Sequence, residues 1–166
     1  MDKNEKTPMR YLDAAVSFEE VPDEINLCIE ITNCPVRCPG CHSRKLWKDI
    51  GTVLDEDTLD RLLEKAAGVT CVCFMGGDRD MNYVCRMAQY IHDRHHLRTA
   101  WYSGHEYGQD VMSRLAGTFD WLKTGPYIIE KGPINDPRTN QRLYRRNDGG
   151  NWDDVTYLMR EEHGIG

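Results

Sequence analysis

Four short apolar segments alternate with helix-like segments in the middle of the chain, and this alternation restricts the possible folds more than any other feature. Each has the length and composition of a buried strand: INLCIEI (25–31), VTCVCFM (69–75), LRTAWYS (97–103) and FDWLKTG (119–125). The segments between them, 57–68, 80–95 and 106–117, place apolar residues at helical spacing. Such alternation is typical of an α/β fold with a parallel sheet. Because so few units cannot close an eight-stranded barrel, we expect an open or partial barrel, or a small doubly wound sheet.

The two ends of the chain are less regular than its middle. Residues 11–21 (YLDAAVSFEEV) predict an edge strand or one arm of a hairpin. Residues 126–166 are loop-rich, with a short helix predicted within 155–164. The chain contains no internal repeat, low-complexity tract or linker, so we expect a single domain over 1–166 with its core at about 25–130.

Charge and hydropathy argue against several classes of protein. A net charge of −6 is unfavourable for a protein whose main role is to grip nucleic acid. No run approaches the roughly 18 apolar residues of a membrane-spanning helix, and the N-terminus lacks the apolar region of a signal peptide. We therefore expect a cytoplasmic protein, in which clustered cysteines hold a metal more often than they form disulfides.

Three cysteines lie close together after the first predicted strand: Cys34, Cys38 and Cys41, at spacing C-x3-C-x2-C. Two prolines and a glycine between them prevent a helix, so a tight loop can turn the three thiols toward one centre. Thiolates select iron–sulfur clusters, zinc or copper(I). A cubane cluster held by three cysteines has one iron without a protein ligand, and a catalytic metal needs such an open position.

Zinc is the main alternative to a cluster, and it requires a fourth ligand. His42 directly follows Cys41, and four further cysteines lie in other predicted elements: Cys28, Cys71, Cys73 and Cys85. The spacing of the three cysteines differs from the paired C-x2-C pattern of zinc sites, which favours an iron–sulfur cluster. The four further cysteines are then expected to be buried apolar thiols.

Glycines and polar residues follow each of the other predicted strands. Gly76, Gly77 and Asp78 come after the second strand, Ser103 ends the third and Gly104 follows it. The carboxyl ends of parallel strands meet at one edge of a sheet, where α/β proteins build their active sites. The sequence therefore predicts that these residues and the cysteines surround one site.

The cysteine spacing, followed by His42, resembles the signature of the radical S-adenosylmethionine (radical SAM) enzymes. The resemblance implies a partial, open parallel βα barrel and a [4Fe–4S] cluster on Cys34, Cys38 and Cys41. It also implies that the open iron chelates the amino and carboxylate groups of S-adenosylmethionine. His42 has two open interpretations: it stacks on the adenine, a role that aromatic residues fill at this place in the family, or it only packs in the loop.

The segment FMGGD (74–78) resembles the glycine-rich GGE stretch of the same family. In that family the glycine backbone meets the amino group of the methionine moiety, which implies this role for Gly76 and Gly77. Asp78 stands where glutamate is more usual. Ser103 has two open interpretations: it contacts the ribose or carboxylate of S-adenosylmethionine, or it serves only the turn.

The segments KTGPY (123–127) and TNQR (139–142) are similar to the activating proteins of anaerobic ribonucleoside-triphosphate reductases, and the similarity extends over roughly residues 10–145. This implies an oxidoreductase that takes an electron from a flavodoxin-type reductant and cleaves S-adenosylmethionine to methionine and a 5′-deoxyadenosyl radical. The radical then removes a hydrogen atom from a glycine of the partner reductase. Because the cofactor carries the chemistry, no general acid–base group is required and none is assigned.

Three other functions remain open at this point. Two keep the radical chemistry: an activase for another glycyl-radical enzyme, or a small-molecule radical SAM enzyme. The third is a non-catalytic zinc or electron-transfer module. Lys123 and Tyr127 either face the site or belong only to a strand end and turn. His92, His95 and His96 are expected to form a solvated helix end rather than a metal site. Four arginines form a basic patch that is either a solvated face or a docking surface for an acidic partner: Arg138, Arg142, Arg145 and Arg146.

Overall fold

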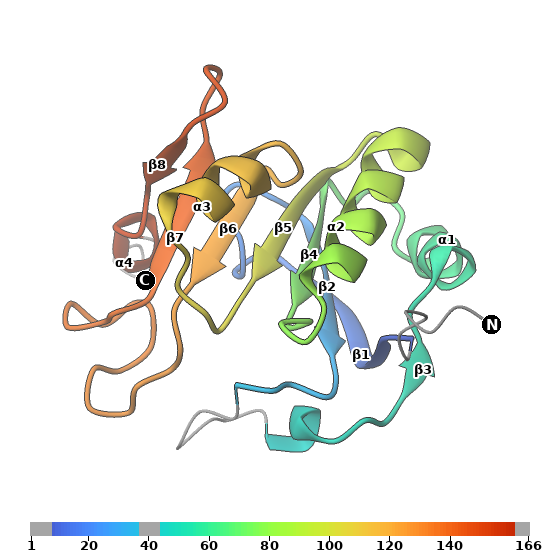
Figure 1. Ribbon diagram of the computed structural model, residues 1–166. Coiled ribbons are helices and arrows are strands. Elements are labelled where there is room, and N and C mark those ends of the chain that lie inside the picture. Colours follow the sequence, from blue (N-terminus) through green and yellow to red (C-terminus); the bar gives the residue numbers. More distant parts are fainter. Residues whose placement is uncertain (1–7, 37–43, 162–166) are drawn as a thin grey trace.

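The computed structural model of the protein describes residues 8–36 and 44–161. These residues form an eight-stranded mixed sheet in the order β3-β1-β2-β4-β5-β6-β7-β8 (Figure 1). The strands are β1 Arg10–Ser17, β2 Asn26–Ile31, β3 Thr52–Val53, β4 Cys71–Met75, β5 Arg98–Tyr102, β6 Trp121–Thr124, β7 Arg142–Arg146 and β8 Trp152–Asp154. The α-helices are α1 Glu56–Lys65, α2 Met81–Tyr90, α3 Gln109–Ala116 and α4 Leu158–Glu161, with a 3-10 turn at Arg44–Trp47 and a π turn at Ile91–His95.

The four central strands are the four predicted from the apolar segments, and they run parallel, as predicted. β2 pairs with β4, β4 with β5 and β5 with β6, each in parallel register. Both faces of these strands are buried, which explains their nearly continuous apolar sequences. Val72 and Phe74 face one core, whereas Cys71 and Cys73 face the other.

Helices α1, α2 and α3 all cover the same face of the sheet (Figure 1). Leu59 of α1, Val84 of α2 and Leu115 of α3 are fully buried in the core that also contains Phe74. The opposite face is covered by the segment around Val21 and by the C-terminal part of the chain, including Met159 of α4. One-sided helices are compatible with the partial barrel expected from the sequence, which stays a prediction.

The flanking strands decide one open alternative and add two strands that the sequence did not predict. β1 pairs antiparallel with β2 and lies between β2 and β3, so residues 11–21 supply a hairpin arm and not an edge strand. The region 126–166, expected to be loop-rich, contains β7 and β8, which pair antiparallel and extend the sheet beyond β6. The short helix predicted within 155–164 is present as α4.

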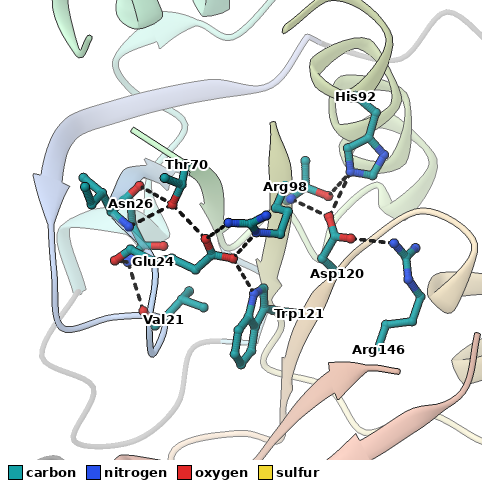
Figure 2. A network of polar contacts seen from close by, with 11 residues as sticks. Val21, Glu24, Asn26, Thr70, His92, Arg98, Asp120, Trp121 and Arg146 are labelled. Atoms are coloured by element: carbon teal, nitrogen blue, oxygen red, sulfur yellow. Dashed lines mark hydrogen bonds and ion pairs between the residues drawn. The ribbon is translucent and has the colours of Figure 1, made fainter. Parts of the chain in front are cut away.

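The amino ends of the parallel strands are joined by a buried polar network (Figure 2). The Glu24 carboxylate accepts hydrogen bonds from Arg98 Nε at 2.6 Å, Thr70 Oγ1 at 2.7 Å and Trp121 Nε1 at 2.9 Å. Burial alone would raise the pKa of Glu24, but these donors hold it below its usual value. Asn26 adds hydrogen bonds from its side-chain amide to the carbonyls of Val21 and Glu24.

A second carboxylate, Asp120, continues this network at the start of β6 (Figure 2). It accepts from the Thr99 backbone N–H at 2.9 Å and from Arg146 Nη2 at 2.5 Å, and lies 3.1 Å from His92 Nε2. Burial opposes ionisation, but these contacts lower the pKa of Asp120. The expected solvated helix end is found for the exposed His96, whereas His92 and His95 are half-buried and paired with carboxylates, His95 Nε2 lying 2.7 Å from Asp60.

Candidate functional site

The carboxyl ends of the parallel strands surround a cavity of about 190 Å³. Its walls include residues that follow four different strands, as the sequence predicted: Cys34, Gly76, Asp78, Ser103, Gly104 and Gly125. The parallel topology therefore brings together motifs that are far apart in the sequence.

Among residues 8–36 and 44–161, no helix combines the length and the apolar character of a membrane-spanning segment.

The base of the cysteine loop is closed by backbone hydrogen bonds. Asn33 N–H donates to the Lys48 carbonyl and Cys34 N–H to the Leu46 carbonyl, both at 2.9 Å. Thr32 Oγ1 donates to the Ile50 carbonyl at 2.7 Å. The half-buried Cys34 thiol is thus held at the cavity wall by backbone that is fixed on both sides.

Val36 fixes the start of this loop against the end of β5. A Cβ added at Gly104 would lie 2.9 Å from a Val36 methyl carbon, so only glycine permits this approach. Three predicted site residues further along the loop, Cys38, Cys41 and His42, lie outside the described residues. Their roles stay predictions.

The two positions after β4 require glycine for different structural reasons. Gly76 has φ of +104°, lines the cavity, and accepts a hydrogen bond from Trp101 Nε1 at 2.7 Å through its carbonyl. Gly77 has φ of +90°, and a Cβ there would lie 2.5 Å from a Val84 methyl carbon beneath α2. Gly77 therefore allows the chain to turn against the core, and its contact with a ligand stays a prediction.

Asp78 joins the loops that follow β4 and β5. Its carboxylate accepts hydrogen bonds from the Ser103 hydroxyl and from the Gly104 N–H, the latter at 3.1 Å. The Ser103 oxygen also accepts from His105 N–H at 3.1 Å, so Ser103 takes part in the turn. A ligand contact by Asp78 or Ser103 stays a prediction.

Tyr107 belongs to the same cluster, and sequence reasoning missed it. Its hydroxyl lies 2.8 Å from Ser103 Oγ and 3.5 Å from Asp78 Oδ1. Burial raises the pKa of Tyr107 to about 12, so the phenol stays protonated. The only available signal was its position four residues after Ser103, which many unrelated tyrosines would share.

Lys123 and Tyr127 line the cavity, as the sequence suggested. One row of paired residues across β4, β5 and β6 also lines the cavity: Met75, Tyr102 and Lys123. Lys123 Nζ lies 4.7 Å from the centre of the Tyr102 ring, and burial lowers the pKa of this lysine. With Asp78, the cavity thus offers both a cation and a carboxylate, which suits a zwitterionic ligand.

The spare cysteines pack in the interior. Cys28, Cys71 and Cys73 are buried on the sheet face opposite α1–α3, which confirms the expectation of apolar thiols there. Burial raises the pKa of Cys71 and Cys73 well above the usual value, and also raises that of the half-buried Cys85. Over residues 8–36 and 44–161, no three His, Cys, Asp or Glu side chains gather as a metal site.

The four arginines near the C-terminus have partners within the protein. Arg138 pairs with Asp136 at 2.9 Å, Arg142 lies 3.7 Å from Asp154, Arg145 lies over the Trp121 ring and Arg146 pairs with Asp120 at 2.5 Å. The interpretation as a simple solvated face is therefore wrong for Arg146, which belongs to the polar network. Docking of the others onto an acidic partner stays a prediction.

Comparison with known proteins gives one match. The model of a family described as a 4Fe-4S single cluster domain matches residues 25–143. This range begins just before β2 and ends within β7, and it contains all three clustered cysteines and every described residue that lines the cavity. No curated protein and no solved structure matches the chain.

Proposed function

Because the chain belongs to the family of 4Fe-4S single cluster domains, we propose that it is a radical SAM activase that forms a glycyl radical on an anaerobic ribonucleoside-triphosphate reductase. The family makes it an iron–sulfur protein. When bound, the cluster supplies one electron, which breaks a C–S bond of S-adenosylmethionine and gives methionine and a 5′-deoxyadenosyl radical that takes a hydrogen atom from the partner's glycine.

The residues around the cavity fit a [4Fe–4S] cluster. Cys34 brings a thiol to the cavity wall on a backbone fixed by hydrogen bonds, and Cys38 and Cys41 would complete the three thiolates. Gly76 and Gly104 line the same cavity, and the missing side chain of Gly104 allows Val36, two residues after Cys34, to pack closely against the end of β5. Thiolate donors are those that iron–sulfur clusters require.

The observation that carries the proposal is that one cavity unites the cysteine loop with the glycine-rich segment after β4 and with two opposite charges. Lys123 can bind a carboxylate, and the Asp78 carboxylate or the Gly76 carbonyl can accept from an amino group. Tyr102 and Tyr127 supply aromatic surface to exclude water. These are the groups that an amino acid joined to a nucleoside needs.

The proposal includes the partial, open parallel βα barrel as the fold. It is supported by four parallel strands with helices on one face. A flavodoxin-type protein is proposed as the electron donor.

The proposal is tested by electron paramagnetic resonance of the partner. Anaerobically reconstituted protein is incubated with S-adenosylmethionine, a reductant and the anaerobic reductase from the same organism. We expect the doublet signal of a glycyl radical, and none with the Cys38→Ala variant. Cleavage of S-adenosylmethionine with no radical on this reductase, but with one on another glycyl-radical enzyme, would contradict the choice of partner.

A further inference from the structure

A groove of about 450 Å³ lies between α3 and the β7–β8 hairpin, outside the cavity described above. The indole of Trp152 donates to the Met112 carbonyl at 2.7 Å and so holds the hairpin against α3. Gln109 and Ser113 line the α3 side, and Asn151 and Tyr144 line the hairpin side. The groove therefore has walls fixed by secondary structure and a lining that is mainly uncharged and polar.

The groove and the cavity share their dividing wall. Thr124 lines the groove, and the next residue, Gly125, lines the cavity. Likewise, Asn140 lines the groove and Gln141 lines the cavity. Tyr107 also lines the groove, and its hydroxyl contacts Ser103 of the cavity at 2.8 Å. A chain lying in the groove is therefore within a few residues of the cavity, because an extended chain advances about 3.3 Å per residue.

An unmet acceptor indicates what kind of ligand would suit the groove. Asn140 Oδ1 is buried and has no hydrogen-bond partner among the described residues, while its Nδ2 donates to the Pro126 carbonyl at 3.0 Å. A buried acceptor without a donor is costly, and Asn140 lines the groove, so a ligand whose N–H group reached this oxygen would be favoured. The side-chain amides of Gln109 and Asn151 each offer a donor and an acceptor, which matches the N–H and C=O of a peptide unit.

We propose that this groove binds the polypeptide segment of the partner that flanks its reacting glycine, so that the glycine itself enters the cavity. This inference rests on the proposed function and names where its polypeptide substrate lies. One acidic and one basic residue, Glu106 and Arg142, line the groove and balance each other. The lining therefore favours an uncharged backbone over a phosphate-bearing ligand.

The test measures peptide binding directly. The probe is a fluorescein-labelled synthetic peptide that carries the reacting glycine of the reductase with its natural flanking residues. Its binding to the reconstituted protein is measured by fluorescence anisotropy. Ser113→Trp fills the groove from an exposed position of α3 and is expected to weaken binding at least about tenfold. Gln89→Trp, at an exposed position of α2 away from the groove, is the matched control and should bind like the wild type.

A second variant guards against misfolding of the first. The double variant Gln109→Ala and Asn151→Ala removes two exposed side chains and adds no bulk, and we expect severalfold weaker binding. Wild-type affinity in both variants, no peptide binding by the wild type, or displacement of the peptide by a nucleoside triphosphate would overturn the inference. Failure of the proposed function would appear separately, as an absence of 5′-deoxyadenosine from the wild type without any peptide.

Discussion

The two ends of the same four parallel strands are built differently. At the amino ends, the carboxylates of Glu24 and Asp120 accept hydrogen bonds from Arg98, Trp121 and Arg146, and polar groups face one another (Figure 2). At the carboxyl ends, polar groups and glycines line a cavity. Polar residues are paired at both ends, but only those at the carboxyl ends also line a cavity, where they can contact a ligand.

The largest expected effect is a difference in cluster content and activity between variants of two cysteines, one within β2 and one just after it. Cys28 is buried within β2, while Cys34 follows that strand and lines the cavity. Cys34→Ala should lose bound iron and sulfide and reduce 5′-deoxyadenosine formation to background, because the proposed cluster would lack one of its three ligands. Cys28→Ala should keep both. Equal iron content in the two variants would remove Cys34 from the ligand set.

The next largest effect is a loss of stability when the polar network at the amino ends of the parallel strands is broken. Glu24→Ala leaves Trp121, Thr70 and Arg98 without their shared acceptor, and should lower the free energy of unfolding by about 3 kcal/mol. The half-exposed Arg98 can turn toward water, which limits the loss. Urea unfolding measures it, with Glu64→Ala at an exposed position of α1 as the control.

If the amino end serves stability alone, the Glu24→Ala variant should form 5′-deoxyadenosine at the wild-type rate per cluster-loaded, folded molecule. A large loss of this specific activity with little loss of stability would break the comparison between the two ends.

A smaller effect compares the glycines on either side of β4. Gly68 and Gly77 have φ of +92° and +90°, but a Cβ at Gly68 meets nothing within 4 Å, whereas one at Gly77 meets Val84 at 2.5 Å. Gly68→Ala should cost about 1 kcal/mol of unfolding free energy from backbone strain. Gly77→Ala should cost about 2 kcal/mol or more, because steric overlap is added. Equal losses in thermal or urea unfolding would show that the Val84 contact is not limiting.

The smallest expected effect is a dependence of the free energy of unfolding on pH. The pKa values of Glu24 and Asp120 are lowered from their ordinary values of 4.5 and 3.8, so their contribution is complete above those values and is lost as the pH falls through the folded-state pKa. Below about pH 4.5, unfolding free energy should therefore decrease with acidification, by at most about 1.4 kcal/mol per pH unit for each group. Glu24→Gln should flatten this slope relative to the wild type. An unchanged slope would exclude Glu24 as a source of acid sensitivity.

Much of the central fold could be predicted because it follows from local sequence. The strands that are buried on both faces have continuous apolar runs, and parallel pairing then requires the residues after each strand to meet. β7 could not be found in this way because only Leu143 among its five residues is fully buried, and arginines dominate the rest. Its place depends on pairing with β6, which is a tertiary effect.

The polar networks could not be predicted for a related reason. Glu24 and Arg98 are 74 residues apart, and neither lies in a motif that indicates the other. Tyr107 is similar: its contact with Ser103 arises from the turn before α3. A single sequence identifies which residues are unusual, but only the folded chain shows which of them meet.

The most direct test of the central claim, that the carboxyl end of these strands performs radical chemistry, is a product assay on the anaerobically reconstituted protein. Iron and sulfide are measured first, and S-adenosylmethionine and dithionite are then added. We predict methionine and 5′-deoxyadenosine in equal amounts, dependent on the reductant. A protein that is loaded with iron and sulfide yet leaves S-adenosylmethionine intact, or one that contains zinc without sulfide, would contradict the account.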